Sequence, residues 1–469
     1  MAELHFPWIE TAIILPLIVA LGTYHRVLSR HQRIICGYTA AAVLLLCLGE
    51  WIDFSLMDTY EAHDHWDLFT WLFARELLVV DALSAPLLPL AALLYTTVFA
   101  TTLKTKVDRF SFRSNLLGLS ILLATLSSRD SWLVIVLLGL SCLPIVPEMI
   151  KRGRSVRTFV FHAALSLTLM LAGQGLLSMS NGNDLLFIIG GFSLTGGCLI
   201  RAGVFPMHCW IADLFEKATF GSGVLFLTPM IGCYAIMRLV FPIAPDYALQ
   251  AIAILSLFTS IYAASISLIQ TDMRRLFAYI LISHSSLVLV GIELATPIGL
   301  AGGLLVWVSV VIALLGFAIT IRSIEARFGR LSLQFFHGLY SHLPFLAGMT
   351  LITGLAAIGF PGTTGFIALE MLLEGVAEVY PAVGIVVAMT AALNGISVMR
   401  AYFHLFTGVK HSTTGSLSCV RVERLAILGI LLLILGGGLF PQPGVSSRYE
   451  AAKDLMEHRS PTHSLPNQD

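Results

Sequence analysis

The chain has 469 residues and a formal net charge of zero, and 57% of its residues are hydrophobic while only 12% are charged. A soluble domain carries about 25% charged residues, so this composition and a mean hydropathy of +0.85 exclude a soluble protein and predict a chain embedded in a lipid bilayer. The balanced charge also excludes a basic surface large enough to bind nucleic acid.

A transmembrane helix needs about 20 mostly apolar residues, and on that basis the sequence predicts an all-α polytopic membrane protein with about 14 spans. The spans are expected near residues 8–24, 33–50, 78–103, 112–127, 131–150, 158–179, 184–202, 220–241, 247–269, 275–293, 298–321, 341–379, 382–407 and 423–441. The tail from Gln442 to Asp469 is polar, and we expect it to be a loose end on the outer face.

Positive charges gather in the connections that follow odd-numbered spans. They belong to Arg26, Arg30, Arg33, Lys104, Lys106, Arg109, Arg113, Lys151, Arg152, Arg154, Arg157, Arg274, Arg275, Arg322, Arg327, Arg330, Lys410, Arg421 and Arg424. The connection after the second span is acidic instead, and we expect a solvated loop there; its acids are Asp53, Asp58, Glu61, Asp64 and Asp67. The positive-inside rule then predicts a multi-pass protein of the bacterial inner membrane with both termini on the outer face.

Two predicted spans are interrupted near the middle and carry a charge beside the interruption. Arg201 precedes Gly203 and Pro206 in the seventh span, and Glu370 follows Pro361 in the twelfth. A charge inside hydrocarbon is costly and usually has a function. Paired helix breaks in the two halves of a transporter point to an ion path near the bilayer midplane. The sequence therefore predicts an ion-conducting membrane subunit with broken helices 7 and 12.

Arg201 lies at the end of the seventh span, five residues before Pro206. Proline breaks a helix and frees carbonyl groups that can hold water or protons. One interpretation is a gate in a hydrated half-channel, in which arginine acts as a fixed positive charge because it does not deprotonate in proteins. The alternative is a guanidinium that reaches the cytoplasmic interface from a helix end.

Four ionisable residues follow in the same stretch, namely His208, Asp213, Glu216 and Lys217. His208 titrates near neutral pH and can carry a proton, while Glu216 and Lys217 are candidate members of a proton path. The alternative for Glu216 and Lys217, as for Trp210, is an ordinary anchor at the membrane interface.

The tenth span contributes a further cluster. Arg274 and Arg275 are topological anchors at its start, and Arg274 is also a candidate path residue. His284 lies about 15 Å deeper, since a helix rises 1.5 Å per residue. It is either a proton relay or a polar residue satisfied between helices.

Glu370 lies beyond the Pro361 break, and Glu374 stands one turn further along the same helix face. A carboxyl group buried in lipid or protein exchanges protons near neutral pH, which would suit an exit site. The alternative is an interfacial pair near the outer end of the span.

No motif predicts a bound cofactor. The sequence has no Walker loop, no dinucleotide fingerprint and no paired cysteines or histidines for haem, iron–sulfur or metal binding. We therefore expect the energy for transport to come from an ion gradient or from partner subunits.

Three stretches resemble signatures of the antiporter-like membrane subunits of respiratory complex I, the L, M and N subunits of NADH–quinone oxidoreductase. Residues 205–213 are similar to P-x-H-x-W-L-P-D, residues 272–284 to D-x-K-R-x-x-A-Y-S-x-I-S-H, and residues 355–366 to the L-x-x-x-G-x-P motif that opens the broken twelfth helix. Mrp-type antiporters and inorganic-carbon-uptake complexes are relatives of this family. Subunit M is the nearest match, because no long lateral helix follows the last span.

The resemblance implies 14 helices with two inverted five-helix repeats, helices 4–8 and 9–13. Residues 1–110 would hold the first three helices, 111–241 and 242–408 the two repeats, and 409–469 the last helix and the outer tail. It also implies a subunit that conducts protons in an assembly with other membrane subunits, and that performs no redox chemistry itself.

The sequence departs from the family pattern at several charged positions. Arg201 stands where the family has a lysine on helix 7, and the family's helix-5 glutamate, helix-8 lysine and central lysine are absent. Glu370 lies within one residue of the charged position on helix 12. Two alternatives to a complex I subunit thus stay open: a proton- or sodium-coupled transporter subunit, for cation exchange or inorganic-carbon uptake, and a degenerate structural subunit.

Overall fold

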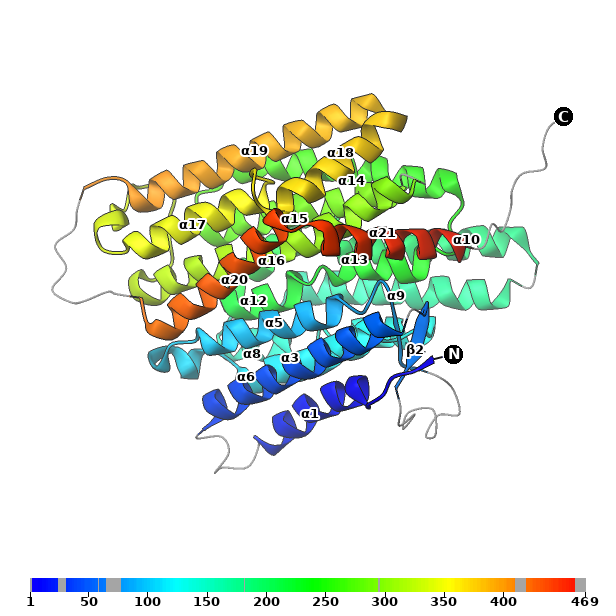
Figure 1. Cartoon of the computed structure of the whole chain (residues 1–469), viewed down its shortest axis with the longest axis horizontal. Helices are drawn as coiled ribbons and strands as arrows, with labels where there is room; N and C mark the ends of the chain where they lie inside the picture. The colour runs from blue at the N-terminus through cyan, green and yellow to red at the C-terminus, as the bar shows by residue number, and fades with distance from the viewer. Residues whose placement is uncertain are drawn as a thin grey trace.

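The computed structural model describes residues 2–23, 31–57, 59–64, 77–180, 182–293, 296–409 and 419–459. Its helices run side by side in one bundle (Figure 1). Several predicted loop charges lie outside the described residues: Arg26, Arg30, Asp58, Asp67 and Lys410.

The helices of the first half are α1 (Trp8–Gly22), α3 (Gln32–Leu56), α5 (Leu87–Ala100), α6 (Phe112–Leu126), α7 (Ser131–Leu140), α8 (Ile145–Lys151), α9 (Arg157–Met179), α10 (Asp184–Ala202), α11 (Cys209–Lys217), α12 (Phe220–Leu227), α13 (Ile231–Ala235) and the π-helical η2 (Ile236–Val240). Those of the second half are α14 (Asp246–Leu268), α15 (Met273–Glu293), α16 (Pro297–Phe328), α17 (Pro344–Ala357), α18 (Thr364–Val379), α19 (Pro381–Phe406), α20 (Arg421–Leu439) and α21 (Gln442–Glu457). Short 3₁₀ turns are η1 (Lys104–Arg109) and η3 (Leu339–Ser341).

Within the described residues, ten helices are long and apolar enough to cross a membrane, and four shorter apolar helices accompany them. Each predicted span contains one of these helices. The chain is therefore a mostly helical, multi-pass membrane protein. The helices differ in how much of them is buried. In the most apolar stretch of each helix, 94% of the residues of α15 and 89% of those of α16 are buried, whereas only 17% of those of α9 are. An apolar helix buried all round belongs to the centre of a bundle, and one exposed to this extent faces lipid or a partner.

Both predicted helix breaks are confirmed. Helix α10 ends at Ala202, and Gly203 follows with a φ of 74°, a left-handed conformation that glycine adopts without a steric penalty. A Cβ atom on Gly203 would also lie 2.1 Å from the Ile211 side chain. The second break lies between α17 and α18, where Gly359 and Gly362 have φ values of 83° and 86°.

The structure contains two further breaks. The predicted fifth span divides into α7 and α8, and the predicted eighth span divides into α12, α13 and η2. In the eighth span, Met230 has a φ of 54°. The carbonyl of Pro229 accepts a hydrogen bond of 3.1 Å from the indole Nε1 of Trp307 on α16. A side chain of the second half thus satisfies a carbonyl freed by the break in the first half.

A small sheet covers one end of the bundle, which we call the sheet end (Figure 1). Its strands are β1 (Ala2–Glu3), β2 (Glu61–His63) and β3 (Val79–Asp81); β1 is parallel to β2 and β2 antiparallel to β3. The predicted third span was wrong at its start, because residues 79–81 pair with β2 and helix α5 begins only at Leu87. The opposite end holds Lys104–Arg109, Lys151 and Arg274, and we call it the basic end.

The prediction of a loose tail from Gln442 was wrong for the part that the structure describes. Residues 442–457 form α21, which packs against α16. The guanidinium of Arg448 is buried and donates to the Ala82 carbonyl at 2.8 Å. The His458 ring stacks on Tyr60 with centroids 3.8 Å apart. The end of α21 and strand β1 therefore lie at the same end of the bundle.

Candidate functional site

Arg201 is buried near the first predicted break and does not reach an interface. The residue lies in the last turn of α10 and is only 6% exposed. Nη2 donates to the Ser141 hydroxyl at 2.8 Å, and the guanidinium carbon lies 4.5 Å from the centre of the Phe226 ring. Its Nε has no hydrogen-bond partner among the residues that the structure describes. A fixed positive charge thus lies inside the protein, stabilised by a hydroxyl and an aromatic face.

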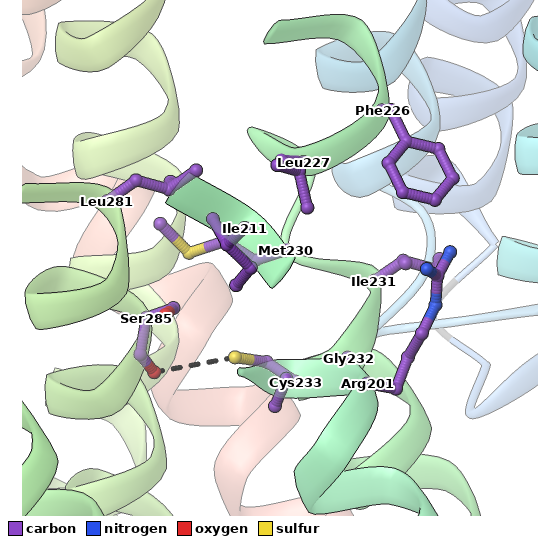
Figure 2. A pocket seen from close by; sticks show the side chains of 11 residues that line it. Arg201, Ile211, Phe226, Leu227, Met230, Ile231, Gly232, Cys233, Leu281 and Ser285 are labelled. Carbon is purple, nitrogen blue, oxygen red and sulfur yellow. Dashed lines mark hydrogen bonds between the residues drawn. The ribbon is translucent and has the colours of Figure 1, made fainter. Parts of the chain in front are cut away.

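A small pocket adjoins this guanidinium (Figure 2). Its wall comes from the break between α12 and α13, from α11 through Ile211, and from α15 through Ser285. The Cys233 thiol donates to the Ser285 carbonyl at 3.4 Å, which ties α13 to α15 across the pocket. Freed backbone groups, a thiol and a positive charge therefore share one interior space.

His284 adjoins the second predicted break. The residue is 3% exposed and lines a second pocket together with Ala357, Gly359 and Gly365 of the break region and with Ser309 of α16. Its Nε2 has no hydrogen-bond partner within the described ranges. This nitrogen is not satisfied by any described residue, and the side chain lines an interior pocket beside a broken helix.

Helix α15 separates the two pockets. Consecutive residues on it line different pockets: His284 lines the pocket at the α17–α18 break, and Ser285 lines the pocket at Arg201. Because α15 is buried almost throughout, both pockets lie inside the protein. One helix thus contributes polar groups to both predicted breaks.

His208 precedes α11 and is 3% exposed. Aromatic rings surround it: Tyr262 lies 5.2 Å, Phe205 6.0 Å and Tyr279 6.1 Å from it between ring centroids. Its Nδ1 has no hydrogen-bond partner in the part of the chain described. Tyr279 in turn hydrogen-bonds to Arg275, one turn nearer the basic end. The ring contact with Tyr279 and the Tyr279–Arg275 hydrogen bond therefore link His208 to that end along α15.

The remaining candidates near the basic end are all ion-paired. Glu216 binds Arg275 at 2.9 Å, and the Lys217 ammonium binds Asp213 at 2.7 Å within α11. The last candidate, Arg274, binds Glu325 at 2.7 Å. The Arg274 pair fastens α15 to α16, which is a structural task. Glu216 is half-exposed and lies at the start of the Arg275–Tyr279–His208 connection.

Glu370 and Glu374, the candidate exit site, are not buried within this chain. Helix α18 buries Ala368, Leu372 and Val376 against its neighbours, four residues apart and so on one face. Glu370 and Glu374 lie on the opposite face and are exposed. The α16–α18 contact is so close that a Cβ on Gly302 would lie 2.5 Å from the Leu372 backbone.

A polar seam that was not predicted from the sequence lies between α14 and α19. Its side chains are those of Ser260, Ser267, Thr390, Asn394 and Ser397, all buried. The Ser267 and Ser397 hydroxyls are 2.6 Å apart, and the Asn394 amide donates to the Ser283 hydroxyl on α15 at 2.9 Å. The spacing of residues 390, 394 and 397 places them on one helix face, and this pattern could have predicted the seam from the sequence. No residue of the described chain bonds to Asn394 Oδ1.

The described residues contain no group of three or more His, Cys, Asp or Glu side chains arranged to hold a metal ion. What the interior offers is a fixed guanidinium, two histidines with an open ring nitrogen, and hydroxyl and amide groups between them. Such groups pass protons along hydrogen bonds or through intervening water.

Comparison with known proteins relates the chain to one family of membrane subunits. The family model described as "NADH:quinone oxidoreductase/Mrp antiporter, TM" matches residues 157–394. An NAD(P)H-quinone oxidoreductase chain 4 of Trichormus variabilis is 25% identical over 94% of this chain and 89% of its own. The NADH-quinone oxidoreductase subunit M of Pseudomonas aeruginosa is 28% identical over 52% of this chain and 49% of its own.

Solved structures share the fold. A chain of the Mrp complex from Dietzia sp. superimposes with a TM-score of 0.84 at 18% identity, covering 96% of this chain and 98% of its own. A chain of respiratory complex I from Thermus thermophilus gives a TM-score of 0.80 at 20% identity, with 97% and 99% covered.

Proposed function

Because the chain belongs to the NADH:quinone oxidoreductase/Mrp antiporter transmembrane family, we propose that it is the proton-conducting membrane subunit of a complex I-like NADH–quinone oxidoreductase. Relatives named as chain 4 and as subunit M of such enzymes support this assignment. Other membrane subunits would be its partners, and electron transfer would take place in them. The chain itself would bind protons and no redox cofactor.

The proposed architecture follows the family. About 14 helices would cross the bacterial inner membrane, with the repeats in residues 111–241 and 242–408, three helices in 1–110 and the last helix in 409–469. The sheet end, where strand β1 and the end of α21 lie, would face outward. The basic end would face the cytoplasm, as the positive-inside rule requires.

The observation that carries the proposal is the position of α15 between the two interior pockets. We propose a proton route along this helix. Protons enter near Glu216, pass Tyr279 and His208, and reach the polar groups of α15. Arg201 sets the positive potential on one side of α15 as a fixed charge, and His284 takes up and releases protons on the other. The seam around Asn394 provides further hydrogen-bonding groups beside α15.

Glu370 is proposed to act only in the assembly. A carboxylate exposed on the bundle at membrane depth is costly in lipid, so a neighbouring subunit would cover it, and Glu374 with it. Protons would then leave along the boundary between subunits and not through the interior of this chain.

A second candidate function is a proton- or sodium-coupled transporter subunit. The matched family includes Mrp antiporters as well as the oxidoreductase subunits. Arg201 favours this alternative over a pump, because a residue that keeps its proton cannot alternate between charge states. Both functions use the same interior route and differ in the ion that drives it.

We expect His284→Gln to lower proton flux through the assembled complex in liposomes by about a hundredfold, the usual contribution of a positioned proton-transfer group. Glutamine keeps the hydrogen-bonding capacity at similar size but does not titrate. A pH-sensitive dye trapped in the vesicles measures the flux.

His162→Gln is the matched control. His162 also lies within a membrane helix, but its Nδ1 is hydrogen-bonded to the Thr158 carbonyl at 2.8 Å and the ring lines neither pocket. Equal flux in both variants would remove His284 from the route. Flux that requires sodium on the opposite side of the membrane would favour the transporter.

A further inference from the structure

Acidic side chains are buried at the sheet end, outside both proposed repeats. Glu10 of α1, Glu50 of α3 and Asp64 after β2 are 2%, 1% and 2% exposed. The prediction of a solvated acidic loop was therefore wrong at Asp64, because this residue, directly after β2, lies against the start of α1. Neither pocket of the proposed route includes these residues.

Asp64 caps helix α1. Its Oδ2 accepts the backbone N–H of Glu10 at 2.6 Å, and the backbone N–H groups of Trp8 and Ile9 also interact with this carboxyl group. The first N–H groups of a helix have no partner within it, and they favour an anion there. Burial nevertheless raises the pKa of Asp64 to about 7, and the neighbouring Glu10 acts in the same direction.

Glu50 has no such compensation. Neither of its carboxyl oxygens has a hydrogen-bond partner among the described residues. The charged groups that act most strongly on it are Asp64, Asp53 and Asp81, which are all acidic. An ionised carboxylate buried without a partner and beside like charges is too costly to persist, so the group binds a proton instead.

Two of the surrounding acids are already neutralised. Asp53 accepts the Trp8 indole N–H at 2.9 Å and pairs with His5 at 2.7 Å, and Asp81 pairs with Arg238 at 2.6 Å. Among the described residues, neither Glu50 nor Asp64 has such a basic or imidazole partner. The charged groups that act on the pair are Glu10 from α1, Asp53 from α3 and Asp81 from β3. His5, from the segment before α1, and Arg238 of η2 adjoin the pair through their ion pairs with Asp53 and Asp81.

We infer that Glu50 and Asp64 form a proton-binding site at the sheet end that exchanges protons with the adjoining compartment. Access comes through His5, whose side chain is 81% exposed and bonded to Asp53, one turn from Glu50 on α3. Protonation stabilises the packing of β2, α1 and α3 at this end, because the two neutral carboxyl groups do not repel each other. The site is independent of the proposed route through α15.

Infrared difference spectroscopy tests the site on the whole protein. A protonated carboxyl group has its own C=O stretching band, so we expect one band that titrates near pH 7 and a second that persists at higher pH. Asp64→Asn should remove the first and Glu50→Gln the second. Glu450→Gln, at an exposed acid of α21, should remove neither.

The site is overturned if the wild-type protein shows no protonated carboxyl signal near pH 7, or if the signal survives in both variants. A signal that disappears when sodium replaces choline at constant pH would overturn it in favour of a cation site. Because none of these measurements uses proton flux, they can fail without affecting the proposed function, and the converse also holds.

The stability of the wild-type protein provides a second test that needs no variant. The pKa of Asp64 in the folded protein, about 7, lies above the ordinary value of about 3.9. The folded state therefore binds an additional proton between these values, and its stability falls as the pH rises from about 4 to about 7. We expect Tm in detergent to decrease over this range and Asp64→Asn to flatten the decrease. A Tm contribution from this site that rises with pH would contradict the assignment.

Discussion

Replacing Arg201 with alanine is expected to reduce proton flux through the assembled complex to the level of protein-free liposomes, whereas Arg201→Lys should retain it or improve turnover. The guanidinium is the fixed positive charge beside the first pocket, bonded to Ser141 and stacked near Phe226. Alanine removes that charge from a low-dielectric interior, where its effect on a passing proton is largest. Lysine restores the charge and can also release its proton when buried.

Arg157→Ala serves as the control for this comparison. Arg157 begins α9, is exposed and lies at the basic end, so the same loss of charge should leave flux unchanged. Equal activity of the wild type and both Arg201 variants would rule out a gate at this position. Equal loss in both variants would show that the guanidinium geometry matters and not the charge alone.

Replacing Asp81 with alanine should destabilise the protein by about 3 to 5 kcal/mol, because removing one partner of a buried pair leaves the other charge unpaired. Asp81 is buried and bound to Arg238 at 2.6 Å, and it accepts the Ser84 N–H at 2.9 Å. Although burial opposes ionisation, Arg238 holds the pKa of Asp81 below its usual value. Denaturant unfolding in detergent measures the loss.

The sheet provides a matched control for Asp81. Glu61 lies directly opposite Asp81 in the β2–β3 register and is paired with Arg129. The Glu61 side chain is 11% exposed and that of Arg129 is 51% exposed, so the arginine end of this pair is open to solvent. Exposed ion pairs contribute about 0 to 1 kcal/mol, so Glu61→Ala should have a small effect. Similar losses in the two variants would show that burial of the Asp81 pair does not determine its contribution.

Hydropathy and charge were sufficient to predict most of the fold. Long apolar runs separated by basic connections placed the helices. Gly203 and Gly359 marked the two breaks, because proline and left-handed glycine interrupt a helix through their own backbone and need no distant contact. The break at Met230 escaped prediction because its φ of 54° is held by tertiary contacts, among them the bond from Trp307. Helix α21 was missed because its polar composition resembles a tail, and only the surface of α16 gives its small residues a partner.

The site was predictable in part. The histidines at 208 and 284 were identified from depth and spacing, and the structure places both in the interior. The exposure of Glu370 could not be predicted, because the sequence gives the depth of a residue in a helix but not the direction in which it points. The burial of Asp64 depends on its contact with the start of α1, between residues 54 positions apart, and no local pattern encodes it.

The bond between Trp307 and Pro229 has a consequence for biosynthesis. The two residues lie 78 positions apart, and a ribosome adds about 5 to 20 residues per second, so the Pro229 carbonyl waits about 4 to 16 s for its donor during translation. An unpaired carbonyl is costly in hydrocarbon. The early half of the nascent chain must therefore keep this carbonyl hydrated, or shielded by the insertion machinery, until α16 enters the membrane.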